Sequence, residues 1–405
     1  MCLIPIVLLT GPFLPDLFVS FLVVCFVALA FKDKEWKYFK NKYFIYFITF
    51  YFYFIFSSLL SKDILFSFES SLFYFRFGIF SLAIWYVLEK NKHILKQFTL
   101  FLLLAFSIAI IDGYYQYLFG NNIFGYVSDS PNRMTLLLND NMILGGYLSR
   151  LFPFLFGLIV LHYSSNKKFI FLIFVFLILI DCLTFMSGER TALGLLVIAT
   201  ILILFLTEKF KILRILSLII SLLVIIYIAN VNIGIKQRTI GFTITQMNLN
   251  ENFDEIKYLS DDHESLSSIA LEMYKDSPLF GFGPKQFRSN CADYMNDSNH
   301  TFCTTHPHNS YLQLAAETGT FGILYILIPF FALSWLMITQ ILNIYIKKND
   351  VFSDYQICLL ITIFLTLWPI LPTLNFFNNW INVIYYMPVG FYLHYVHSGV
   401  EKKIN

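Results

Sequence analysis

The chain has 405 residues, of which 58% are hydrophobic and 19% aromatic, whereas only 13% carry a charge. Its mean hydropathy of +0.67 lies outside the range of soluble globular domains and excludes that class. The net charge of +2 gives no sign of a nucleic-acid partner, because Lys and Arg occur mostly in short tracts between apolar runs. The composition therefore predicts a polytopic membrane protein whose partner is the lipid bilayer.

The apolar runs predict membrane-spanning helices, since a hydrocarbon core roughly 30 Å thick needs about 20 apolar residues in helical form. The strands of a β-barrel would instead alternate apolar and polar residues, which these runs do not. The predicted fold class is all-α, with about twelve transmembrane helices. We expect them near residues 2–12, 14–31, 43–60, 72–89, 98–119, 144–163, 169–187, 191–207, 215–231, 319–339, 356–373 and 380–396. The first run ends at Gly11-Pro12, so a half-crossing or a kinked hairpin fits it equally well.

Basic tracts give the expected orientation. If every predicted span is real, all of these tracts fall on one side, which the positive-inside rule makes cytoplasmic. The tracts are 32–42, 89–96, 167–168, 208–214, 347–348 and 402–403. Losing one interior span would place them on both faces. We therefore expect both termini to be cytoplasmic.

The opposite face carries the polar segments, namely 61–71, 120–143, 187–190 and 232–318. The last is long enough to be a subdomain, so we divide the chain into a membrane domain of residues 1–231, a loop subdomain of residues 232–318 and a second membrane domain of residues 319–405. Within the subdomain, SLSSIALEMYKDSP predicts one amphipathic helix. Its apolar residues at helical spacing are Leu266, Ile269, Ala270 and Met273.

Two of the six cysteines, Cys291 and Cys303, lie in the long outer loop, where a disulfide is permitted. We predict a bond between them; the alternative is two free thiols. The other four lie in predicted spans and behave as small hydrophobes: Cys2, Cys25, Cys182 and Cys358. Together with His300, His306 and His308 the loop cysteines match no familiar zinc spacing, so we expect no metal site.

Arginines near the outer face are candidate anion ligands. Arg190 stands in the tight turn between two spans, and Arg76 and Arg150 lie several residues inside theirs, where an ionisable group usually faces a cavity or a partner. Asp112, also in a span, is a possible partner for one of them, and snorkelling to lipid headgroups is the alternative role. Three of the arginines, Arg190, Arg288 and Arg150, could converge on a diphosphate, whose oxygens Arg binds bidentately.

The segment CTTHPHNSYLQLAAETG at 303–319 concentrates polar groups at the mouth of a span. His308 could act as a general base, because imidazole titrates near neutral pH and can take a proton from a sugar hydroxyl. A lone loop histidine is more often solvated or structural. His306 two residues before it, with Asn309 and Glu317 after it, favours a functional role.

These residues resemble a known family. THPHNSYLQLAAETG is similar to the conserved-motif region of the bacterial O-antigen ligase and O-antigen polymerase superfamily, in which a histidine precedes a glycine after ten residues, as His308 precedes Gly319. Further similar segments are SGERTALG at 187–194, KDSPLFGFGPKQFR at 275–288, LTGPFLPD at 9–16 and WPILPTLNFFNNW at 368–380. The resemblance spans nearly the whole chain.

The resemblance implies a GT-C-like, metal-independent, inverting glycosyltransferase without a cofactor, in the bacterial inner membrane with its active site facing the periplasm. The implied donor is a glycan on undecaprenyl diphosphate. The acceptor is the lipid A-core oligosaccharide in ligases and another lipid-linked repeat unit in polymerases. His308 corresponds to the base that activates the acceptor hydroxyl, and Arg190 to a diphosphate ligand. We further expect Arg150, Arg76, His306, His263, Asn309 and Glu317 to bind substrate.

One departure from the family pattern concerns a second arginine near the loop helix, where this chain has Asp261-Asp262-His263-Glu264. Either His263 or Arg288 takes over that role, and Arg288 is favoured because it stays charged at any physiological pH. The cysteine spacing also fits the family's disulfide-bearing loop.

Three alternatives to an O-antigen ligase remain. An O-antigen polymerase would use the same donor chemistry, so the residues do not separate the two. A transporter or flippase of lipid-linked glycans should show paired broken helices at mid-membrane and often internal repeats, neither of which is evident. A membrane scaffold does not account for Arg and His gathered outside the bilayer.

Overall fold

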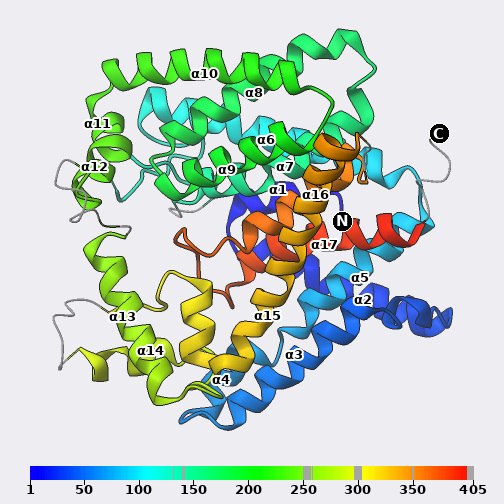
Figure 1. Cartoon of the computed structure of the whole chain (residues 1–405), viewed down its shortest axis with the longest axis vertical. Helices are drawn as coiled ribbons and strands as arrows, with labels where there is room; N and C mark the ends of the chain where they lie inside the picture. Colours follow the sequence, from blue (N-terminus) through cyan, green and yellow to red (C-terminus); the bar gives the residue numbers. More distant parts are fainter. Residues whose placement is uncertain are drawn as a thin grey trace.

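The computed structural model describes residues 1–130, 132–138, 142–249, 257, 259–295, 303–348 and 351–398. All regular elements among these residues are helical, which confirms the predicted fold class (Figure 1). The long helices are α2 (Phe13–Lys32), α3 (Lys42–Leu59), α5 (Phe75–Lys90), α6 (Ile94–Phe119), α7 (Leu144–Tyr163), α8 (Lys167–Met186), α9 (Arg190–Leu206), α10 (Lys211–Val231), α15 (Ser310–Leu342), α16 (Asp354–Thr366) and α17 (Asn379–Ser398). The shorter ones are α1 (Ile4–Val7), α4 (Ile64–Ser71), α11 (Ile233–Lys236), α12 (Phe242–Gln246), α13 (Asp261–Asp276) and α14 (Phe287–Asn290).

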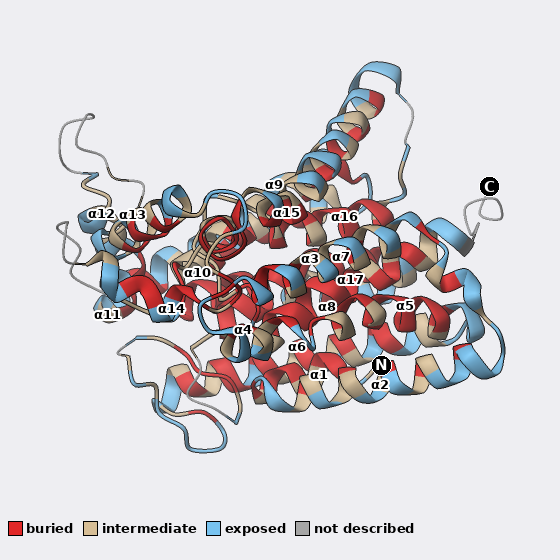
Figure 2. Ribbon diagram, turned by 90° about the horizontal axis from the view of Figure 1, so that it is seen from below, coloured by how far each residue is buried: buried red, intermediate tan, exposed pale blue. Residues whose placement is uncertain are grey.

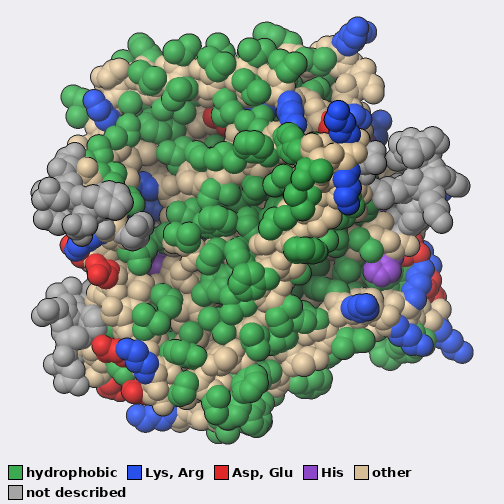
Figure 3. All heavy atoms as spheres, in the orientation of Figure 1, with side chains coloured by type: hydrophobic (Ala, Val, Ile, Leu, Met, Phe, Trp, Pro, Cys, Tyr) green, Lys and Arg blue, Asp and Glu red, His purple; other side chains and the backbone are tan. Residues whose placement is uncertain are grey.

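Most predicted spans coincide with a helix. Eight helical segments in the described part are long and apolar enough to cross a membrane, and α9 and α16 are shorter apolar helices. Hydrophobic side chains cover the middle of the face seen in Figure 3, and charged side chains gather toward its margins, as a bilayer-embedded surface requires. The chain is a multi-pass membrane protein.

The first predicted span, 2–12, is wrong as a full crossing. Its helical part is α1 followed by a 3₁₀ turn, Leu8–Thr10. Seven helical residues at roughly 1.5–2 Å each reach only about 10–14 Å, less than half of the hydrocarbon core. Gly11, with φ of +102°, ends the turn, and α2 starts directly after Pro12.

Helix α7 lies at the centre of the bundle and packs on α6, α8, α9 and α16. In its hydrophobic window 94% of the residues are buried, and Figure 2 shows buried residues concentrated among the inner helices. An apolar helix surrounded by other helices needs no polar face, so α7 can be buried on nearly all sides.

A fully buried ion pair fixes α10 to its neighbours. The guanidinium of Arg214 donates to the carboxylate of Asp181 on α8 at 2.7 and 2.9 Å, and to the hydroxyl of Thr200 on α9 at 2.6 Å. A buried charge is tolerated only when it is paired and hydrogen-bonded, as it is here.

Asp112 does not pair with an arginine, so that part of the prediction is wrong. Its carboxylate accepts hydrogen bonds from the Gln116 side chain and from the backbone N–H of Ile123, both at 2.8 Å. These local donors satisfy the buried carboxylate and fix the chain that leaves α6.

Basic tracts meet at one end of the bundle. Lys90 pairs with Glu35, joining the tracts at 89–96 and 32–42. The carboxylate of Asp354 accepts from the backbone N–H groups of Glu208 and Lys209 at 2.8 and 2.9 Å, which brings the tract at 208–214 to the start of α16. The tail Lys402-Lys403 lies outside the described residues. The orientation of this end toward the cytoplasm stays a prediction.

Candidate active site

The loop subdomain is built on the predicted amphipathic helix. Helix α13 buries Leu266, Ile269, Ala270 and Met273, which confirms the helical spacing. They form a small core with Phe287, Cys291 and Ala316. The predicted disulfide between Cys291 and Cys303 is present, with Cα atoms 6.0 Å apart. It joins the end of α14 to the segment that leads into the histidines. His300, between the two cysteines, lies outside the described residues.

Gly319 explains the spacing of the histidine and glycine. It adopts φ of +64° and interrupts α15, and a Cβ there would lie 2.3 Å from the carbonyl oxygen of Leu279. Gly281 has φ of +68°, and its Cβ would lie 2.3 Å from the Glu317 carbonyl carbon. The two segments, one around Gly281 and one around Gly319, therefore approach each other so closely that each needs a glycine at this point. Both glycines also have positive φ, which other residues adopt only at a cost. Nearly three helical turns therefore separate His308 from a fixed break.

His308 is held at the start of α15 by the loop of residues 367–378, between α16 and α17. It has φ of +55°, and its carbonyl oxygen accepts a hydrogen bond of 2.7 Å from the Thr373 N–H. Asn309 caps α15 by accepting from the N–H groups of Tyr311 and Leu312, and its side chain donates to the Pro369 carbonyl at 2.8 Å. Asn309 thus has a clear structural role.

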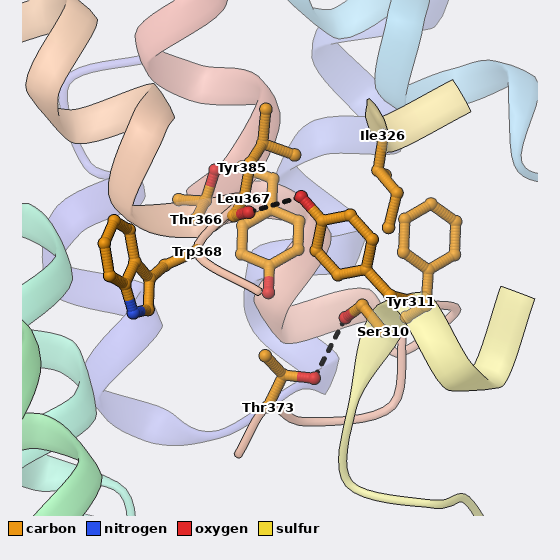
Figure 4. A pocket seen from close by; sticks show the side chains of 9 residues that line it. Ser310, Tyr311, Ile326, Thr366, Leu367, Trp368, Thr373 and Tyr385 are labelled. Atoms are coloured by element: carbon orange, nitrogen blue, oxygen red, sulfur yellow. Dashed lines mark hydrogen bonds between the residues drawn. The ribbon is translucent and has the colours of Figure 1, made fainter. Parts of the chain in front are cut away.

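Figure 4 shows how the same loop meets α15 beneath this point. The Ser310 and Thr373 hydroxyls lie 2.9 Å apart, and the Tyr311 hydroxyl donates to the Leu367 carbonyl at 2.6 Å. The side chain of Tyr385 enters this layer from α17. These contacts join the start of α15, the loop of residues 367–378 and α17, and so fix the segment that contains the histidines.

Three histidines, His263, His306 and His308, lie next to one another at this point. The ring centroids of His306 and His308 are 4.2 Å apart, and those of His308 and His263 are 5.4 Å apart. His263, in the first turn of α13, bonds through Nδ1 to the Ser260 hydroxyl at 2.7 Å. A pocket of about 50 Å³ opens beside His263 and His308. Its lining is Leu259, His263, Ser267, Pro307, His308, Asn309, Leu312, Ile370 and Pro372.

The histidines are poised in the neutral form. Burial, and then the charge of His263, lowers the pKa of His308 below its usual range. Burial and the neighbouring His308 lower the pKa of His306 to about 3. A neutral imidazole can accept a proton at physiological pH, as a general base must.

Arginines from three separate segments gather beside the histidines. Burial lowers the pKa of Arg238, and the charges of Arg133 and Arg190 lower it further. Burial, and then the charge of Arg190, likewise lowers the pKa of His263. We call Arg133, Arg190 and Arg238 the arginine cluster. Nε of Arg133 and Nε of Arg238 are buried without a hydrogen-bond partner. Three mutually repelling cations with unused donors form a site suited to a multiply charged anion.

Arg133 and Arg238 were missed in the sequence analysis, which concentrated on arginines within spans and turns. A simple signal was available, because the predicted outer segments contain four arginines in all, and these are Arg133, Arg190, Arg238 and Arg288.

Two predicted ligands are not members of the arginine cluster, although Arg150 lies next to it, where it and Arg133 both act on Glu189. Arg76 donates to Asp16 at 2.8 Å and to Asn379 at 2.9 Å, joining the starts of α2, α5 and α17. Arg150 is buried in α7, where it donates to the Gly146 carbonyl at 3.3 Å and bonds the Tyr385 hydroxyl. Both guanidinium groups are engaged within the bundle.

Arg288 and Glu317 occupy the other side of the histidines. Arg288 is exposed on α14, 5.9 Å from the ring of Phe66, and its charge acts on His306. Glu317 is fully buried and accepts from the Phe287 N–H at 3.1 Å and from the Gln313 side chain at 3.0 Å. Its carboxylate fixes α14 to α15, which is a structural task rather than substrate contact.

The arrangement defines a polytopic helical membrane protein with a cationic site beside a histidine pocket at the end of the bundle opposite the basic tracts. Residues 172–327 match the sequence model of the O-antigen ligase family. Over this stretch the chain, a multi-pass membrane protein, is similar to that family. The matched stretch contains Arg190, Arg238, His263 and His308, and ends before the loop that holds His308. Among curated proteins none matches the chain. The family indicates a glycosyltransferase-type enzyme that handles a lipid-linked glycan in a bilayer.

Proposed function

We propose that the chain is an O-antigen ligase: an inverting, metal-independent glycosyltransferase that moves a glycan from undecaprenyl diphosphate to lipid A-core in lipopolysaccharide biosynthesis. The observation that carries the proposal is the junction at His263, whose ring lies 5.4 Å from that of His308 and whose pKa is lowered by the charge of Arg190. The candidate base and the arginine cluster are thus adjacent, which supports glycosyl transfer from a diphosphate donor.

In the proposed step, His308 accepts the proton of an acceptor hydroxyl. The hydroxyl oxygen attacks the anomeric carbon of the donor from the face opposite the diphosphate, which inverts the configuration. The bond from that carbon to the diphosphate oxygen breaks, and its electron pair leaves with undecaprenyl diphosphate. The neutral form of His308 at physiological pH supports this role.

The arginine cluster would bind the departing diphosphate. Charge accumulates on its oxygens as the bond breaks, and fixed cations outside bulk water stabilise such charge far better than solvent does. Arg190 and Arg238 then provide the two cationic contacts that the family resemblance implies, with Arg133 as a third. Arg288 and His306 are left to bind the acceptor side.

The proposed location is the bacterial inner membrane, with the site at the periplasmic face and the C-terminus in the cytoplasm. Because residues 2–12 do not cross the membrane, the expected cytoplasmic N-terminus is replaced by one on the periplasmic side. Support comes from the basic tracts, which meet at one end of the bundle, whereas the arginine cluster lies on segments that leave the other end.

The test is transfer by the purified full-length protein, supplied with undecaprenyl-diphosphate glycan, with or without lipid A-core, and with EDTA present throughout. We expect label on lipid A-core despite the chelator, and none with His308→Ala in protein that unfolds at the wild-type temperature. Longer lipid-linked glycans from donor alone would indicate a polymerase instead. No product in either tube, with glycan carried across vesicles, would indicate a transporter.

A further inference from the structure

Glu189, the residue before Arg190, has an unusual set of partners. Its two carboxylate oxygens accept hydrogen bonds from the backbone N–H groups of Gly145 and Gly146, at 2.7 and 3.0 Å. These N–H groups belong to the first turn of α7, which has no intrahelical acceptors for them. A carboxylate at a helix N-terminus also interacts favourably with the helix dipole. Glu189 therefore caps a helix more than 40 residues away in the chain.

The start of α7 is shaped to receive this carboxylate. A Cβ on Gly145 would lie 2.3 Å from the Ser187 hydroxyl oxygen, and one on Gly146 would lie 3.2 Å from a Glu189 oxygen. A side chain at Gly145 would force the turn away, and one at Gly146 would make a tight contact with the carboxylate. The pair of glycines in an otherwise well-filled helix thus has a specific reason, which is to seat the turn that carries Arg190.

The opposite side of the turn at 187–190 contacts the loop between α6 and α7, which contains Arg133. Gly188 adopts φ of +70°, and a Cβ there would lie 2.2 Å from the Asn132 carbonyl oxygen. The Met134 N–H donates to the Ser187 carbonyl at 3.2 Å. The turn therefore holds the backbone on both sides of Arg133, while Glu189 holds the start of α7 from which Arg150 projects.

The charged groups facing Glu189 are cations from each of these elements. They are Arg133 from the loop after α6 and Arg150 from α7, and both act on its carboxylate. Arg190 follows it in the chain, with Arg238 and His263 beyond. Burial raises the pKa of Glu189 to about 7, although the two arginines and the two N–H donors hold it down. Its charge is thus present above about pH 7 and is lost below.

We infer that Glu189 is a positioning residue for the proposed transfer reaction: its carboxylate links α7 to Arg133 and thereby directs Arg190 and Arg133 toward the same anion. The inference rests on the proposed function. Glu189 touches neither donor nor acceptor; it compensates the inner cations so that the outer donors remain free for the diphosphate. When Glu189 is protonated, Arg133 and Arg150 lose their shared counter-charge and the arginine cluster loses its arrangement.

The test compares Glu189→Gln, which keeps the shape and removes the charge, with Glu189→Asp, which keeps the charge. Glu35→Gln is the matched control, because it breaks an ion pair with Lys90 at the far end of the bundle. We would measure kcat and KM for the lipid-linked donor between about pH 5.5 and 8.5. Because charged hydrogen bonds are the strong ones, we expect Glu189→Gln to lose roughly tenfold or more in kcat at about pH 8.

The pH profile separates positioning from simple structural support. In the wild type the acid side of the kcat profile should fall with a midpoint near the Glu189 pKa of about 7. In Glu189→Gln that limb should disappear. The remaining fall in kcat should occur at lower pH, where His308, whose pKa is lowered, becomes protonated. Glu189→Asp should retain the limb with an intermediate kcat, and Glu35→Gln should match the wild type.

Two results would overturn the inference: a Gln variant with kcat within about twofold of the wild type, or one that keeps the limb near pH 7. If Glu189→Gln fails to fold, loss of the limb in Glu189→Asp would do the same. Failure of the proposed function gives a different pattern, in which His308→Ala transfers normally whatever Glu189 does.

Discussion

Replacing Arg238 by Ala should lower activity without lowering stability. In most proteins the removal of a half-buried arginine is destabilising, because a paired charge is lost. Arg238 has the reverse environment: the neighbouring charges that act on it are Arg133 and Arg190, and its Nε is buried with no partner. Its removal relieves repulsion, so the unfolding temperature should stay constant or rise.

The expected loss of donor binding follows from the contact that is removed. One charge-assisted hydrogen bond contributes about 1.5–3 kcal/mol, which corresponds to roughly a 10- to 150-fold weaker interaction with the diphosphate. Arg238→Lys should recover part of this, since Lys supplies charge without the bidentate geometry. The effect should shrink as salt rises, because ions screen partly exposed charges.

The assay is transfer kinetics, together with inhibition by inorganic pyrophosphate and thermal unfolding in the same detergent. Arg76→Ala is the matched control, because this arginine is paired with Asp16 and contacts Asn379 on the same side of the bundle. We expect it to lose stability while pyrophosphate inhibition stays unchanged. An Arg238→Ala protein that is less stable, yet inhibited by pyrophosphate as strongly as the wild type, would refute the assignment.

Three further changes test the architecture. Gly319→Ala should lower the free energy of unfolding by about 1–2 kcal/mol for the left-handed backbone alone, and by more for the contact with Leu279. It should also reduce kcat by displacing His308. Circular dichroism melts and transfer kinetics check this, and wild-type values of both would contradict it. Replacing Cys291 and Cys303 together by Ser opens a loop with a sequence separation of 12 and should cost about 2–3 kcal/mol; melts with and without reductant would reveal it, and equal stability would count against it. Asp181→Ala should cost about 3–5 kcal/mol by leaving Arg214 unpaired in the membrane, measured by unfolding in detergent, whereas an undiminished unfolding temperature would show that the pair is dispensable.

Local patterns predicted local structure well. The spacing of Leu266, Ile269, Ala270 and Met273 sufficed for α13, because a helix face is determined by the residues within it. Most apolar runs likewise coincide with helices, although α16 ends at Thr366, before the end of the predicted span 356–373. The first run forms no full span. There hydropathy was satisfied, but Gly11 and Pro12 ended the helix too early, so composition overstated its length.

Long-range partners were beyond the same reasoning. The sequence suggests that Arg76 is a free cation, whereas in the structure its Nε donates to the carboxylate of Asp16, 60 residues earlier, at 2.8 Å. Arg238 stands between two unremarkable stretches, and its significance arises only when separate outer segments meet. The sequence contains the residue types of the site, but which ones converge depends on helix packing that no short pattern encodes.

The contact between Thr373 and His308 has a consequence for biogenesis. The segments with the arginine cluster leave the ribosome long before Thr373, so a partly synthesised chain would already contain the proposed diphosphate ligands. Its histidine would still lack the backbone bond that fixes it. Under the proposed function, the site would therefore be complete only once α16, α17 and the loop between them are in place.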